Sequence, residues 1–340
     1  MSRARDLANV ADDVSTGTVV TTASPSLGRR NLIINGAMQV AQRGTSFSHN
    51  GAVSQYPADR YNVNIYNTGF TTPTGGTSAQ VSLSQESIES GLDFTKALRI
   101  TPASDSKLCY ASQRVEDVTL FSNKTVTFSF YCRVGSGSIN INTSGTRFTQ
   151  LFGSGGSTAV STYEGSGQTI TTTWQRFEVT ITIPSVSGKT IGSGNCLQVS
   201  LLDGIDLSSL NGSWIEFTGV QLEVGSVATP FEHRSYGEEL ALCQRYYTFF
   251  GGISNGFPLI QSYTGTLDNR DFPISFPVRM RATPTGTKNG TWDVLNCGQP
   301  TVRFLSPDGF SFGAIPTNAA ANFYAYPSST DDTLTFSAEL

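Results

Sequence analysis

Hydrophobic and polar residues alternate along much of the chain between residues 31 and 234, which is the period of a strand buried on one face. In VTFSFYCRV at 126–134 every second residue is apolar, and RFEVTITI at 176–183 and LQVSL at 197–201 repeat the pattern. Clusters of Gly, Ser and Asn between these segments mark turns. The pattern predicts an all-β chain with a jelly-roll β-sandwich over residues 31–234.

The segment WIEFTGVQLEV at 214–224 departs from strict alternation. Ile215 and Phe217 are odd-numbered, whereas Val220, Leu222 and Val224 are even-numbered. Because one extra residue in a strand exchanges its two faces, the change at Gly219 predicts a β-bulge.

A linking helix is predicted within residues 235–249. Ser235 and Glu238 form the capping-box pattern of a helix N-terminus, and apolar residues then recur at helical spacing over about 236–247. The predicted apolar stripe consists of Leu240, Cys243 and Tyr247.

Residues 250–340 are predicted to form a second, smaller β-domain for oligomerisation, receptor binding or both. In FPISFPVRM at 272–280 apolar residues alternate, but two intervening residues are prolines. Proline cannot donate a hydrogen bond to a neighbouring strand, so we expect this strand at a sheet edge or against another subunit. Further strands are expected near 301–305, 322–326 and 333–338.

The first 30 residues differ from the rest. Leu7, Val10 and Val14 recur at helical spacing on one face of a short N-terminal helix over residues 2–14, and a polar connector follows. So short a helix is marginal unless it packs on another structure. We interpret residues 1–30 as an attachment helix and tether, although a frayed terminus would have the same composition.

The composition suits an all-β protein and argues against some classes of function. The chain has 340 residues, with 34 Gly, 21 Phe and 12 Tyr but only 14% charged residues, which matches aromatic pleated surfaces joined by many turns. A net charge of −4 without a cluster of Lys and Arg is unlike a nucleic-acid-binding protein. No stretch approaches the roughly 18 apolar residues of a membrane span, and no secretory signal is recognisable. We therefore expect a chain made in the cytoplasm without membrane insertion.

Titratable residues gather between residues 219 and 247, which makes this segment the first candidate for catalysis. His233 has no metal-binding partner at helical spacing, and Cys243 falls on the apolar stripe more than two turns away. We interpret Cys243 as a buried structural thiol and expect Arg234 and Arg245 to pair with nearby carboxylates. The five scattered cysteines of the chain are expected to be reduced and mostly buried.

No assembled catalytic motif is recognisable elsewhere. The chain contains no nucleophile elbow, phosphate-binding glycine loop or EF-hand loop. The acidic turns at 268–271 and 331–332 could contribute to a cation site, but solvated turns are commoner. We therefore predict no catalytic residue, no metal site and no cofactor.

Several stretches resemble a known family. They are NLIINGAMQVAQRGTS at 31–46, ADRY at 58–61, QLEVGSVATPFE and YGEELALCQRYY within 221–247, and FPVRMRATP at 276–284. They resemble tail-fibre and virion structural proteins of bacteriophages, over most of residues 30–290. The final Tyr of ADRY is a departure, because the family usually has Trp there. The resemblance implies a jelly-roll domain similar to carbohydrate-binding modules, assembly as a trimer, and a place on the virion beside other tail proteins.

Three hypotheses about function follow. The first is a tail fibre without catalysis that recognises host-surface glycans. Its candidate residues are Tyr324 and Tyr326, which point outward if Phe323 and Ala325 face the core, and which are equally consistent with a subunit contact. The second is a structural or adaptor protein of the virion. The third is a hydrolase of cell-surface polysaccharide, which no motif supports.

Overall fold

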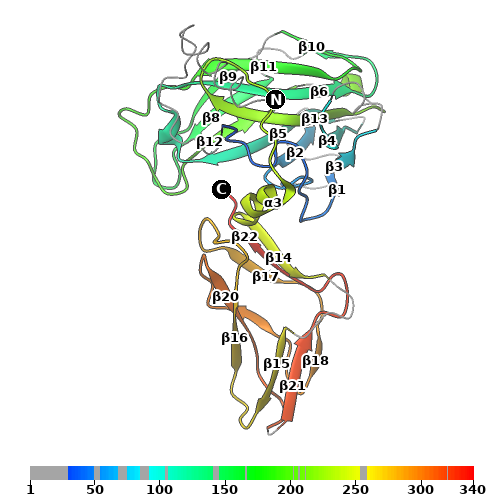
Figure 1. Ribbon diagram of the computed structural model, residues 1–340, viewed down its shortest axis with the longest axis vertical. Coiled ribbons are helices and arrows are strands. Elements are labelled where there is room, and N and C mark those ends of the chain that lie inside the picture. The colour runs from blue at the N-terminus through cyan, green and yellow to red at the C-terminus, as the bar shows by residue number, and fades with distance from the viewer. Residues whose placement is uncertain are drawn as a thin grey trace, which may run out of the picture.

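The chain folds into a large β-sandwich and a smaller β-unit, with helix α3 between them (Figure 1). The computed structural model describes residues 30–49, 54–67, 75–84, 92–103, 106–140, 145–164, 167–201, 203–205, 207–210, 212–252, 259–319 and 321–340. The expected N-terminal helix, with Leu7, Val10 and Val14, lies outside these residues. The prediction of an all-β fold built on a jelly-roll sandwich is confirmed. No helix in the described part of the chain is long and apolar enough to cross a membrane.

Two antiparallel sheets form the sandwich. One has the strand order β1-β3-β4-β13-β6-β11, and the other has the order β2-β5-β12-β8-β9. The strands of the first sheet are β1 (Ser46–His49), β3 (Gly76–Ser82), β4 (Lys96–Thr101), β13 (Ile215–Val224), β6 (Thr125–Val134) and β11 (Gln175–Thr182). Those of the second are β2 (Asn62–Asn67), β5 (Ser106–Glu116), β12 (Cys196–Ser200), β8 (Thr146–Leu151) and β9 (Val160–Glu164). A ribbon of β7 (Ile139–Asn140) and β10 (Thr169–Ile170) and the 3-10 helices η1 (Val118–Phe121) and η2 (Ser208–Leu210) lie between these strands in the chain.

Packing between the two sheets explains the alternation of β6. Its even-numbered apolar residues are at most 1% exposed and face the core: Val126, Phe128, Phe130, Cys132 and Val134. The Phe128 ring meets Phe148 of the opposite sheet edge to face, with centroids 6.0 Å apart. Burial of each large apolar side chain stabilises the fold by roughly 1.5–3 kcal/mol, so this strand is a main contributor to the sandwich core.

The bulge predicted at Gly219 is present in β13. The register of β13 against β6 shifts between Thr218 and Gln221, and Gly219 has a φ of 59°. This left-handed conformation is easily adopted by glycine and strained for other residues.

Replacing Gly219 by alanine is expected to lower the free energy of unfolding by about 2–4 kcal/mol, from backbone strain together with overpacking. An added Cβ would lie 2.5 Å from Cζ of Phe94 and 2.8 Å from Cδ2 of Tyr131. Gly237 of α3 is the matched control, because a Cβ there meets nothing within 4 Å. Gly237→Ala is expected to stabilise the chain by up to about 1 kcal/mol. Equal effects of the two substitutions on urea unfolding would contradict this account.

Helix α3 (Tyr236–Gln244) begins as predicted but ends earlier. The Ser235 side chain accepts a hydrogen bond from the backbone N–H of Glu238 at 3.3 Å. The predicted end at Tyr247 is wrong, because Tyr247 begins strand β14 (Tyr247–Gly251) and pairs with Ser337. Strand pairing with the far end of the chain thus replaces the last helical turn.

The four cysteines whose side chains are described are unpaired and buried, as expected: Cys132, Cys196, Cys243 and Cys297. The side chain of Cys109 lies outside the described set.

Three antiparallel three-stranded sheets form the C-terminal unit. Their orders are β14-β22-β17, β15-β21-β18 and β16-β20-β19. Their remaining strands are β15 (Ile260–Thr264), β16 (Arg270–Ser275), β17 (Thr285–Lys288), β18 (Asp293–Leu295), β19 (Thr301–Arg303), β20 (Gly309–Ala314), β21 (Ala321–Tyr326) and β22 (Thr333–Ser337). Phe336, Phe323 and Phe312, one from each sheet, are all 0% exposed and belong to one core. Each sheet therefore has one face toward this core and one face outward.

The proline-bearing strand β16 lies at a sheet edge, as predicted, but it is shorter than the pattern 272–280. The backbone N–H of Phe276 donates to the carbonyl oxygen of Asp308 at 3.0 Å, and that of Met280 donates to Pro307 at 2.8 Å. This segment therefore follows the turn between β19 and β20 instead of extending the strand.

His49 closes the edge strand β1 and is buried in its neutral form. Its Nε2 lies 2.8 Å from the Ser78 hydroxyl oxygen, and burial lowers the imidazole pKa to about 4. Because the unfolded chain binds the proton more readily, the stability contributed by neutral His49 is complete above pH 6.5 and is lost as the pH falls toward 4.

The wild-type chain is therefore expected to lose more stability than His49→Gln between pH 6.5 and pH 4. Thermal unfolding of both chains across this range measures the difference. Parallel stability curves for the two chains would contradict the assignment.

Candidate functional site

The titratable residues between 219 and 247 make structural contacts. His233 Nε2 lies 3.4 Å from a carboxylate oxygen of Asp93, and the imidazole stacks on Phe94 with ring centroids 5.5 Å apart. Cys243 is 0% exposed, and burial raises the pKa of its thiol well above the usual value. A protonated buried thiol is not a nucleophile.

The two arginines of this segment pair with carboxylates, as predicted. Arg234 donates to a carboxylate oxygen of Glu239 at 3.1 Å and to the carbonyl oxygen of Ile33 at 3.0 Å. Arg245 donates to the Glu116 carboxylate of β5 at 3.1 Å. These bonds attach α3 and the following strand to the sandwich.

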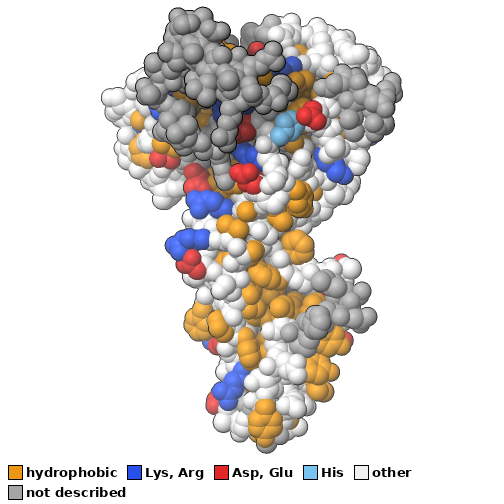
Figure 2. Space-filling model, in the orientation of Figure 1, with side chains coloured by type: hydrophobic (Ala, Val, Ile, Leu, Met, Phe, Trp, Pro, Cys, Tyr) orange, Lys and Arg blue, Asp and Glu red, His pale blue; other side chains and the backbone are white. Residues whose placement is uncertain are grey.

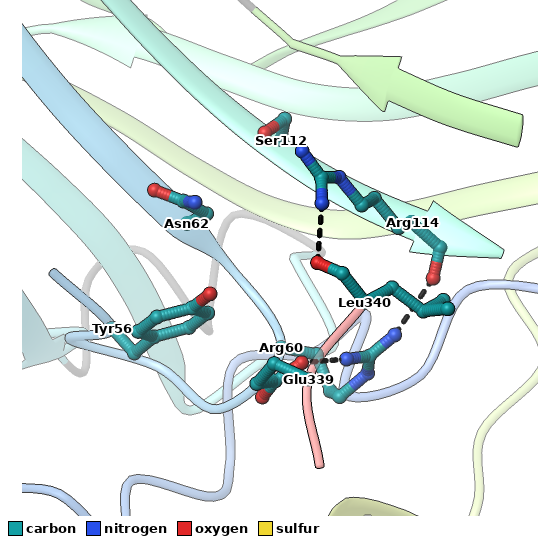
Figure 3. Close-up of a pocket in the computed structure, with 7 residues that line it drawn as sticks. All are labelled: Tyr56, Arg60, Asn62, Ser112, Arg114, Glu339 and Leu340. Carbon is teal, nitrogen blue, oxygen red and sulfur yellow. Dashed lines mark hydrogen bonds and ion pairs between the residues drawn. The ribbon is translucent and has the colours of Figure 1, made fainter. Parts of the chain in front are cut away.

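A small pocket lies where the last residues of the chain meet the sandwich (Figure 3). Its lining residues are Tyr56, Arg60, Asn62, Ser112, Arg114, Glu339 and Leu340. The Arg60 guanidinium donates to the Glu339 carboxylate, and Arg114 donates to the Leu340 carbonyl oxygen. Arg60 and Arg114 of the sandwich are thus bonded to Glu339 and Leu340. The pocket is therefore a contact between the two units rather than an open ligand site.

The outward face of the sheet β15-β21-β18 has a different character. Phe323 and Ala325 of β21 are 0% exposed and face the core, so Tyr324 and Tyr326 point outward, as the alternation predicted. Their ring centroids lie 5.6 Å apart, with an angle of 42° between the planes. Figure 1 places this sheet at the end of the molecule opposite the sandwich.

Neighbouring strands add polar and apolar side chains around the two rings. Gln261 and Leu295 lie opposite Tyr324, and Asp293 lies opposite Tyr326. Tyr263, opposite Asn322, is 63% exposed. We call this surface the tyrosine face; it consists of Gln261, Tyr263, Asp293, Leu295, Asn322, Tyr324 and Tyr326. Exposed hydrophobic side chains are visible along the C-terminal unit in Figure 2.

Asp293 lies beside the Tyr326 phenol on the tyrosine face. Hydrogen bonding with the Asp293 carboxylate, together with its negative charge, raises the pKa of the Tyr326 phenol above its usual value. A protonated phenol can both donate a hydrogen bond and accept one from a ligand. Aromatic rings beside carboxylate and amide groups can stack on an apolar ligand surface and bond its hydroxyl groups.

Sequence reasoning found two of these residues and missed the rest. The β-period identified the outward direction of Tyr324 and Tyr326, but Tyr263 and Asp293 reach the face through strand pairing. In the sequence, each of these two residues belongs to a short strand whose pairing partner and register cannot be read from the pattern.

A second polar surface lies on the five-stranded sheet of the sandwich. Arg147 Nη2 is 2.7 Å from an oxygen of Asp203, and the guanidinium carbon is 5.9 Å from the ring centroid of Tyr163. Burial raises the pKa of the Asp203 carboxyl, although Arg147 opposes this effect. The Tyr163 ring is 47% exposed and stands beside a guanidinium, whereas the tyrosine face brings three tyrosine rings onto one sheet.

Neither surface contains the donor set of a metal site. Within the described residues, no three or more His, Cys, Asp and Glu side chains are grouped so that they could hold a metal ion.

Comparison with known proteins finds no matching family model and no similar curated protein. Among solved structures, the chain is similar to the enzymatically active domain of tailspike protein 4 from bacteriophage CBA120, with 12% identity and a TM-score of 0.32. This match covers 57% of the chain but only 21% of the tailspike.

Carbohydrate-binding modules are also among these matches. The CBM22-1 xylan-binding domain of Paenibacillus barcinonensis Xyn10C is matched over 58% of the chain and 96% of its own length, with 12% identity and a TM-score of 0.31. The tandem CBM22-1-CBM22-2 domain of the same protein is matched over 93% of the chain and 100% of its own length, with 11% identity and a TM-score of 0.32. These similarities concern the fold alone.

Proposed function

We propose that the chain is a bacteriophage tail fibre without catalytic activity, which attaches to the host by binding surface glycans at the tyrosine face. The observation that carries the proposal is the cluster of Tyr263, Tyr324 and Tyr326 beside Asp293 on the outward face of the sheet most distant from the sandwich, where Tyr263 and Asp293 are exposed and the other two rings are half-buried. Sugars present C–H-rich faces that stack on aromatic rings and hydroxyl groups that bond to carboxylates and amides.

The remaining parts of the proposal rest on the sequence. The resemblance of residues 31–46 and 221–247 to tail-fibre proteins supports a place on the virion and assembly as a homotrimer. Residues 1–30 then attach to other tail proteins. The edge strand β16 is suited to a subunit contact, because an uncovered edge would otherwise invite unwanted pairing.

A structural or adaptor protein of the virion without receptor binding is the alternative. In that case the tyrosine face contacts another subunit, and its exposed rings are buried in the assembled particle. A polysaccharide hydrolase is less well supported, because titratable groups of the 219–247 segment are already paired, Arg234 with Glu239 and His233 with Asp93, or buried, as Cys243 is.

A glycan microarray probed with the full chain tests the proposal. Binding to bacterial-surface oligosaccharides is expected, without cleavage of the bound glycans. If no glycan binds and immunogold labelling locates neither chain end on the tail, the tail-fibre function is wrong.

A further inference from the structure

The tyrosine face has an unbalanced charge. Asp293 is exposed and is the only residue of this face that is charged at neutral pH, because the others are amides, tyrosines and a leucine. The neighbouring sheet β16-β20-β19 carries Arg270, which donates to the Thr266 hydroxyl at 2.9 Å, and Arg303, whose Nη1 lies 3.3 Å from an oxygen of Asp271. Among the residues of the face itself, a ligand therefore meets one negative charge and no positive charge.

The Asp293 carboxylate is also arranged to accept hydrogen bonds. Asp293 is exposed and lies opposite Tyr326 in the strand pairing, so its carboxylate oxygens are accessible to hydrogen-bond donors of a ligand. A ligand that fits must therefore donate hydrogen bonds, as adjacent sugar hydroxyl groups do. A ligand carboxylate cannot donate and would repel the carboxylate of Asp293.

We infer that the tyrosine face selects uncharged sugars with free hydroxyl groups and discriminates against acidic sugars. Asp293 determines this specificity. The inference rests on the proposed function. Two like charges about 4 Å apart in water disfavour binding by roughly fivefold, and by more where water is partly excluded. Salt screens this repulsion, so the discrimination decreases as ionic strength rises.

The test uses matched oligosaccharides and the full chain. One oligosaccharide contains only neutral hexoses, and the other has one hexose replaced by the corresponding hexuronic acid, so that the pair differs by a single carboxylate. Isothermal titration calorimetry at low salt is expected to give at least about fivefold tighter binding of the neutral member. Asp293→Asn, which keeps the shape and the hydrogen-bond acceptor, is expected to reduce the difference to less than about twofold.

Asp308→Asn is the matched control. Asp308 is an exposed carboxylate of the same unit that pairs with Arg279, so its substitution changes the net charge equally. The control is expected to retain the discrimination of the wild-type chain.

The other possible binding results distinguish failure of the inference from failure of the proposed function. Equal or tighter binding of the acidic member overturns the inference but leaves glycan binding intact. Discrimination that persists in Asp293→Asn overturns the role of Asp293. Absence of binding to either member, and to every glycan of the microarray, overturns the proposed function and the inference with it.

Discussion

Replacing Glu339 by alanine is expected to lower the free energy of unfolding by about 3–5 kcal/mol, because it removes one partner of a buried ion pair. Glu339 is 12% exposed and bonds to Arg60, which is 2% exposed, and to Arg43 at 2.9 Å. The Arg60 guanidinium also lies 3.3 Å from the ring centroid of Tyr246. Without the Glu339 carboxylate, this buried cation loses its counter-charge.

The same substitution is expected to loosen the C-terminal unit from the sandwich. Glu339 follows β22 in the chain, whereas Arg43 and Arg60 belong to the sandwich, so their bonds join the two units directly. Calorimetry would measure the loss of stability, and small-angle scattering would show a wider range of orientations between the units.

Arg279→Ala is the matched control for Glu339→Ala. Its ion pair with Asp308 has side chains 66% and 63% exposed, and pairs of this kind contribute at most about 1 kcal/mol. Similar effects of the two substitutions on stability would show that the Glu339 contacts do not join the two units.

Replacing Tyr324 and Tyr326 together by threonine is expected to weaken glycan binding by at least about thirtyfold, which corresponds to 2 kcal/mol or more. The substitution removes two adjacent rings from the centre of the tyrosine face while retaining residues that favour a strand. Both side chains point away from the core, so the fold is expected to remain. Circular dichroism and thermal unfolding check that expectation.

The sandwich provides the control for this variant. Tyr163→Thr removes an exposed ring from the five-stranded sheet, beside Arg147, and is expected to leave glycan binding unchanged. If Tyr163→Thr lost glycan binding and the double variant did not, the glycan-binding site would lie on the sandwich surface.

The fold was largely predictable because local periodicity and burial agree in this chain. Alternation in β6 and the change of parity at Gly219 each match an observed feature. The predictions failed where distant hydrogen bonds decide the local structure. Tyr247 continues a helical pattern but pairs with Ser337, and Met280 continues an alternating pattern but donates to Pro307.

The candidate site was only partly predictable for a related reason. The period of one strand is enough to direct Tyr324 and Tyr326 outward. The positions of Tyr263 and Asp293 depend on which strands flank β21 and in which register, and both follow from the closure of three sheets around one core. The segment 219–247 had the opposite outcome: it looked like a site in the sequence, but its arginines form structural ion pairs with Glu239 and Glu116.

Isothermal titration calorimetry of the full chain with a microarray-selected neutral oligosaccharide tests the central claim most directly. The account predicts saturable binding by the wild-type chain and by Tyr163→Thr, and at least about thirtyfold weaker binding by the Tyr324→Thr and Tyr326→Thr double variant. Wild-type affinity in a correctly folded double variant would contradict glycan recognition by the tyrosine face.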